Sequence, residues 1–142
     1  MMRIAKAVTK YICGLFYIVA GINHFAVAEF YLRIMPDYIP QEFHWPAVAV
    51  SGIAEVVLGV LLLVPRTTRL AAWGLIALLI AVFPANIYVY QHPDLFPGVS
   101  QTVHLIRLWL QGVLIAWAYW YTRPDPRRTE LPAPIVDVGS PS

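Results

Sequence analysis

The sequence predicts an all-α fold, a transmembrane four-helix bundle with both termini cytoplasmic. Three observations predict it. Of the 142 residues, 59% are hydrophobic and only 13% are charged, whereas soluble domains carry about 25% charged residues. Four apolar segments each have the ~20 residues that a helix needs to cross a bilayer. The Lys and Arg residues lie mostly at one end of these segments.

The four apolar segments are expected to be helices, because only helices and closed barrels satisfy their backbone hydrogen bonds in lipid. None of them shows the period-two alternation of a barrel strand. They cover residues 7–25, 46–64, 70–90 and 102–122. A four-span membrane domain is therefore expected over residues 1–123. The Pro-rich and polar residues 124–142 are expected to form a disordered cytoplasmic tail.

The basic residues predict the orientation of the spans, because Lys and Arg gather in cytoplasmic connections. Eight of the ten lie on one side of a four-span arrangement: Arg3, Lys6, Lys10, Arg66, Arg69, Arg123, Arg127 and Arg128. A second interpretation stays open. The basic start, the apolar stretch and the triplet of residues 26–28 also fit a cleavable signal peptide, which would leave three spans.

The first outer connection, residues 26–45, mixes apolar and charged side chains in the run EFYLRIMPDYIP. This mixture fits a short helix that lies in the membrane interface and ends near Pro36. An ordinary loop with apolar anchors fits it equally well. In either case an interfacial segment follows the first span.

Several classes of chemistry are excluded or lack a motif. Cys13 is the only cysteine, which excludes an internal disulfide, a CxxC pair and a metal site of several thiolates. The basic residues form no single face for nucleic acid. The chain has no Gly-rich phosphate loop, no GxSxG and no haem-like His pair. No catalytic residue is assigned, and no spacing favours a metal site of His24, His104 and Glu55.

Glu55 lies in the middle of the second span, where a charged side chain costs about 2.5–3.5 kcal/mol on insertion scales. Such a residue usually faces the bundle interior and has a partner there. Arg107 on the fourth span shares one helix face with His104 and Gln111, at spacings of three and four residues. The pattern predicts that Glu55 pairs with Arg107.

All four spans carry polar residues in the outer half of the membrane, when depth is counted at ~1.5 Å per residue. The predicted polar cluster is Asn23, His24, Ser51, Glu55, Asn86, His104, Arg107 and Gln111. Pro84 removes a backbone donor and can free a carbonyl nearby. Gly52 and Gly59 lie near the Glu55 face and allow a neighbouring helix to approach closely. The cluster can bind a ligand or only fix helix register.

Three runs of sequence resemble the DoxX-like family of small four-helix membrane proteins. They are GINHFAVAEFYLRIMPDYIP, SGIAEVVLGVLLLVPRTTRLAAWGLIALLIAVFPANIYVY and WAYWYTR, and the resemblance covers about residues 11–123. It rests on GxxHF, a mid-span Glu after Ser-Gly, and FPAN. It implies a multi-pass protein of a bacterial inner membrane. Some relatives are subunits of a thiosulfate–quinone oxidoreductase, and similar animal proteins act as membrane chaperones or cargo receptors.

Two functions of different class follow from the cluster and the resemblance. The first is an accessory or binding subunit of a quinone-linked redox complex, with Phe25, Tyr31 and Phe83 packing the quinone ring. The second is a non-catalytic scaffold, chaperone or lipid-binding protein. Proton-coupled transport is disfavoured, because the polar residues occupy only the outer half of the path. The expected partners are membrane lipids and redox-complex subunits, not nucleic acid, and the only expected cofactor is a bound quinone or lipid.

Overall fold

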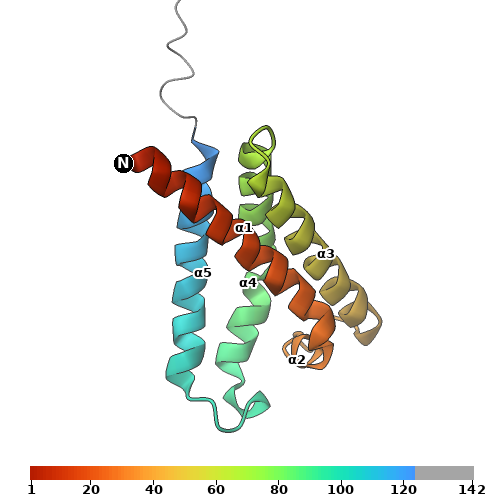
Figure 1. The fold of residues 1–142 in the computed structure, drawn as a ribbon. Coiled ribbons are helices and arrows are strands. Elements are labelled where there is room, and N and C mark those ends of the chain that lie inside the picture. The colour runs from red at the N-terminus through yellow and green to blue at the C-terminus, as the bar shows by residue number, and fades with distance from the viewer. Residues whose placement is uncertain (124–142) are drawn as a thin grey trace, which may run out of the picture.

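The computed structural model describes residues 1–123, apart from the side chains of residues 2 and 3. Four long helices dominate this part (Figure 1): α1 (Met2–Ala26), α3 (His44–Leu63), α4 (Thr68–Gln91) and α5 (Gln101–Thr122). These bounds confirm that the four apolar segments are helical. The predicted tail, residues 124–142, lies outside the described residues.

Three helices of the described part are long and apolar enough to cross a membrane: Ile4–Ala26, Gln41–Leu63 and Thr68–Gln91. Large apolar side chains such as Ile12, Val50 and Ile80 are exposed on their surfaces. Apolar surface of this extent marks contact with lipid or with another protein. The fourth long helix, α5, has 22 residues and carries the polar residues His104, Arg107 and Gln111.

The order of the helices around the bundle decides which side chains meet. In Figure 1, α1 runs diagonally across the other helices, and α4 lies between α3 and α5. The main helix pairs are α1 with α3, α4 with α5, and α3 with α4. Near its start α1 also contacts the end of α5, where Lys6 Nζ donates to the carbonyl of Arg123 at 3.2 Å. Both ends of the described chain therefore lie at the same end of the molecule.

Glycines bring α1 and α3 together. A Cβ added to Gly21 would lie 2.5 Å from the carbonyl oxygen of Gly52, and one added to Gly52 would lie 2.9 Å from that of Gly21. Gly59 approaches Gly14 in the same way, with 2.8 Å between its added Cβ and the Gly14 oxygen. Small residues permit such close backbone contact between membrane helices. The prediction that Gly52 and Gly59 allow a close helix approach is confirmed.

The two connections that the sequence predicts to be outer lie together at the opposite end from the chain termini. The first contains α2 (Ala28–Arg33) and the 3-10 turn η1 (Gln41–Phe43), and the second contains η2 (Pro93–Leu95). The short helix predicted before Pro36 is thus present. The rings of Phe30 and Phe96 join the two connections, with their centroids 5.1 Å apart. This contact holds the first connection over the space between the helices.

Candidate functional site

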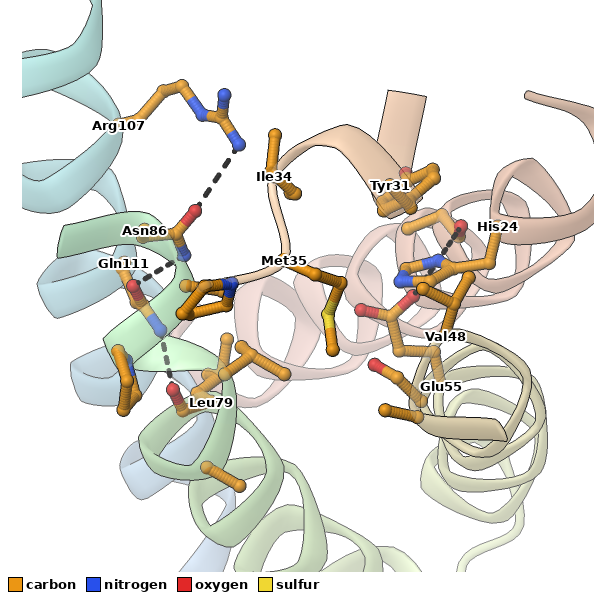
Figure 2. Close-up of a pocket in the computed structure, with 18 of the residues that line it drawn as sticks. His24, Tyr31, Ile34, Met35, Val48, Glu55, Leu79, Asn86, Arg107 and Gln111 are labelled. Carbon is orange, nitrogen blue, oxygen red and sulfur yellow. Dashed lines mark hydrogen bonds and ion pairs between the residues drawn. The ribbon is translucent and has the colours of Figure 1, made fainter. Parts of the chain in front are cut away.

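A cavity of about 510 Å³ lies between the long helices and the first outer connection (Figure 2). Its volume falls within the ~300–1,000 Å³ of small-molecule sites. Apolar side chains from α1, α3, α4 and α5 form most of its wall, among them Phe16, Val48, Leu79 and Leu114. Polar side chains reach it from two opposite sides, which are named here the acidic wall and the amide wall.

The acidic wall is formed by α1 and α3 and contains Tyr17, His24, Ser51 and Glu55. The Nδ1 atom of His24 lies 3.2 Å from Oε2 of Glu55 and 3.0 Å from the carbonyl oxygen of Ala20. A carbonyl oxygen only accepts hydrogen bonds, so Nδ1 carries the hydrogen and donates it to Ala20. The contact between His24 and Glu55 is therefore electrostatic rather than a full hydrogen bond.

Tyr31 of α2 covers the acidic wall. Its ring stacks on the imidazole of His24, with 3.8 Å between the centroids and 22° between the planes. Burial raises the pKa of the Tyr31 phenol, Glu55 raises it further, and Arg107 lowers it. The free phenol already titrates near pH ~10, so Tyr31 presents a neutral ring with a polar hydroxyl. It is the one residue of the expected aromatic wall that lines the cavity.

Three atoms on the acidic wall are buried without a hydrogen-bond partner among the described residues: Tyr17 OH, Ser51 Oγ and Glu55 Oε2. Buried polar atoms are nearly always satisfied, and leaving one unpaired costs about 1–3 kcal/mol. All three residues line the cavity. These atoms lie beside the cavity, and no described protein atom satisfies them.

The amide wall is formed by α4 and α5 and is fully connected (Figure 2). Arg107 Nη2 donates to Asn86 Oδ1 at 3.2 Å, and Asn86 Nδ2 donates to Gln111 Oε1 at 2.8 Å. Gln111 Nε2 then donates to the carbonyl of Leu79. Leu79 is next to Ile80, whose carbonyl lacks its helical donor because Pro84 has no N–H. The chain of bonds fixes the orientation of both amides.

The predicted pairing of Glu55 with Arg107 is wrong. Glu55 contacts His24 instead, and Arg107 donates to Asn86. The physical reason is the helix order, because α4 separates the helices that carry Glu55 and Arg107. Figure 2 shows the two side chains on opposite sides of the cavity, with Ile34 and Met35 of the first connection between them.

Of the eight residues in the predicted cluster, six line the cavity: His24, Ser51, Glu55, Asn86, Arg107 and Gln111. The structure does not bring Asn23 or His104 to it. Asn23 is exposed although it is next to His24. His104 is buried 6.1 Å from the Phe96 ring, and neither ring nitrogen has a partner within residues 1–123.

Two aromatic residues expected around a quinone ring lie elsewhere. Phe25 and Phe83 are 45% and 38% exposed and do not line the cavity. Phe25 instead packs edge-on against Trp45, with 6.4 Å between the ring centroids. Both side chains therefore lie outside the cavity and are partly exposed.

Sequence reasoning did not single out Tyr17 or the apolar residues of the first connection. Tyr17 precedes His24 by seven residues, so it lies on the same helix face, and that spacing was the available signal. It is 2% exposed. Ile34, Met35, Pro36 and Ile39 close the outer side of the cavity, as the interfacial position of the segment suggested. The sequence pattern does not predict which residues these four side chains contact.

The chain belongs to the family described as a domain of unknown function (DUF8561), whose model matches residues 13–122. The match includes every residue that lines the cavity. No curated protein and no solved structure matches the chain. The cavity therefore lies entirely within the domain that defines the family.

Proposed function

We propose that this chain is a multi-pass protein of a bacterial inner membrane that binds a small amphipathic molecule, a quinone, in the cavity between its helices. In this proposal α5 is the fourth span and both termini face the cytoplasm. The chain acts as an accessory or binding subunit of a quinone-linked redox complex. Membrane lipids and other subunits of that complex are its partners.

The observation that carries the proposal is the set of unpartnered atoms on the acidic wall. Tyr17 OH, Ser51 Oγ and Glu55 Oε2 are buried beside a cavity of about 510 Å³ and have no partner among residues 1–123. A purely structural polar cluster would satisfy its own atoms, because each unsatisfied atom costs about 1–3 kcal/mol. The amide wall does satisfy its own atoms. The contrast supports a ligand that bonds to the acidic wall.

The layout of the two walls fits a ring with oxygen atoms on opposite edges. Arg107 offers donors from one side, and the hydroxyl groups of Tyr17 and Ser51 offer donors from the other. Apolar side chains such as Leu79 and Val48 lie between the walls and suit the faces of an aromatic ring. A quinone headgroup has this distribution of polar edges and apolar faces.

The redox context rests on the resemblance to DoxX-like proteins rather than on the cavity. No catalytic motif accompanies the resemblance, which supports binding rather than intrinsic catalysis. Cys13 is buried and is the only cysteine, so the resemblance does not extend to a disulfide-forming chain. A bound quinone or lipid is the only cofactor in this proposal.

Arg33 and Arg107 favour a second candidate, a scaffold that binds an anionic lipid. Arg107 lies 5.8 Å above the ring of Phe30, and Arg33 lies 5.9 Å above the ring of Phe96. Both guanidinium groups are thereby held at the outer connections, where lipid headgroups lie. A phosphate group held there would leave the acidic wall without a partner, which makes this candidate the weaker one.

Extraction of the protein purified in mild detergent tests the proposal. Mass spectrometry of the organic extract should show a quinone in near-stoichiometric amount. A soluble benzoquinone added to delipidated protein should stabilise it by about 2.7 kcal/mol at a concentration of 100 times Kd. Trp109→Leu on the exposed surface of α5 is the control and should keep this stabilisation. Equal stabilisation of Arg107→Leu would place the quinone outside the cavity and contradict the proposal.

A further inference from the structure

The cavity is not enclosed on every side, because some of its lining side chains are also exposed at the surface of the molecule. Ala47 of α3 and both Ala81 and Pro84 of α4 line the cavity and are exposed. A side chain that meets both conditions lies at the rim of an opening. The cavity therefore has an opening between α3 and α4, which is named here the α3–α4 window.

The window follows from the way in which α3 and α4 pack. Near the turn that joins the two helices they are in close contact, since a Cβ added to Gly74 would lie 2.5 Å from Cδ2 of Leu58. Farther from this turn the helices diverge (Figure 1). Ala47 and Pro84 lie at similar distances from the turn along their helices. Both therefore belong to the divergent part, where the gap between the helices is widest.

The surroundings of the window are apolar. Both helices that border it are long and apolar enough to cross a membrane, and the large side chains of Val50 and Ile80 are exposed beside it. The rim itself consists of alanine and proline side chains, which are small and carry no polar atoms. A hydrocarbon chain can therefore pass the rim without meeting a polar group, and the window opens toward lipid rather than toward water.

The other exposed parts of the cavity lining suit a hydrocarbon chain less well. Phe16 of α1 and Leu110 of α5 are 46% and 51% exposed and line the cavity, but their large side chains occupy the space at that rim. Tyr38 of the first connection is also exposed and lines the cavity. The same connection buries Ile34 and Pro36 against the cavity, so its segment covers that side.

We propose that the ligand of the cavity carries a long apolar chain, and that this chain passes through the α3–α4 window into the surrounding lipid. The inference rests on the proposed function and adds the chain of the quinone and its route. The headgroup lies among the polar side chains of the two walls, while the chain stays in apolar surroundings along its length. The ligand then enters sideways from the membrane and does not displace the first connection.

Photolabelling of the purified full-length protein in lipid nanodiscs locates the chain. The probe is a benzoquinone with a decyl chain that carries a diazirine close to the ring, and mass spectrometry identifies the labelled residues. Labelling that excess decyl benzoquinone suppresses should fall on the rim of the window, at Ala47, Ala81 and Pro84. Suppressible labelling at Phe16 and Leu110 instead, or in the first connection, would overturn the inference and leave the proposed function standing. Absence of suppressible labelling on every segment that lines the cavity would overturn both.

Ala81→Phe gives a second measurement, because it places a large ring at the rim of the window. The dissociation constant of decyl benzoquinone should rise about tenfold relative to that of the same benzoquinone without a chain, since the ring takes the space of the chain. Ile80→Phe is the matched control and should keep the wild-type ratio, because Ile80 is 59% exposed and does not line the cavity. An unchanged ratio in folded Ala81→Phe would overturn the inference. The labelling of wild type decides the matter if this variant does not fold.

Discussion

His24 and Glu55 join α1 to α3 at the cavity, with His24 Nδ1 lying 3.2 Å from Glu55 Oε2 and their side chains only 10% and 14% exposed. The contact depends on the glycines next to it. A Cβ added to Gly52 would lie 2.7 Å from the Cβ of His24 and 2.9 Å from the carbonyl oxygen of Gly21. The close backbone approach is therefore what brings the imidazole to the carboxylate.

Energetic coupling between His24 and Glu55 is the first prediction. His24→Phe or Glu55→Gln alone should lower the unfolding free energy in detergent by about 1–3 kcal/mol, because each removes the electrostatic contact between the two buried side chains. A double-mutant cycle should give an interaction energy of about 0.5–3 kcal/mol. The control cycle pairs Glu55→Gln with Arg107→Gln and should be additive within about 0.5 kcal/mol. The reverse result, coupling only in the control cycle, would contradict the structure.

The glycine contact gives the second prediction. Gly21→Ala should destabilise the protein by about 1–3 kcal/mol, because the new methyl group overlaps the backbone of α3. Gly112→Ala in α5 is the matched control, since an added Cβ there has no atom within 4 Å. It should be neutral or stabilising, because alanine favours helix by ~1 kcal/mol over glycine. Similar losses in the two variants, measured by unfolding in detergent, would show that α1 and α3 do not pack in this way.

The helices were predictable from sequence because their signal is local. Each apolar run of spanning length became one helix, and the run before Pro36 became α2. Counting along each helix grouped residues of all four helices into one cluster, because position along a helix can be read from the sequence. Six of the eight residues in the predicted cluster line the cavity.

The order of the helices around the bundle was not predictable, and the errors follow from it. Glu55 and Arg107 both line the cavity, but only the structure shows that α4 separates their helices. Asn23 and His24 are adjacent in sequence and face different directions, and the rotation of α1 decides which of them is buried. Apolar runs carry little information on rotation when lipid and protein both favour apolar side chains.

Gln111 gives the third prediction, which concerns the amide wall. Gln111→Glu keeps the shape of the side chain but removes the donor to the carbonyl of Leu79, so two acceptors then face each other. The unfolding free energy should fall by about 1–3 kcal/mol or more. Gln101→Glu is the control, because Gln101 is exposed at the start of α5, where a negative charge is favourable. A loss in the control as large as that of Gln111→Glu would contradict the role of the bond.

The fourth prediction concerns topology. In a Cys13→Ala background, single cysteines at Gln41 and Asp94 should react with an impermeant thiol reagent in intact cells, and one at Pro65 should not. Asp94 is preferred to Gly98, whose φ of 98° strains any other residue. All three sites should react once the membrane is permeabilised. Labelling at Pro65 in intact cells would show that the orientation is inverted or that the number of spans is not four.

The most direct test of the ligand cavity uses the unpartnered hydroxyl groups of Tyr17 and Ser51. Tyr17→Phe and Ser51→Ala each remove one unsatisfied group, so the unfolding free energy without ligand should stay the same or rise. The affinity for the added benzoquinone should fall by about five- to tenfold. Gain of stability with loss of affinity is the result expected if these atoms bond a ligand. Loss of stability with unchanged affinity would show that they serve the fold, and would contradict the account.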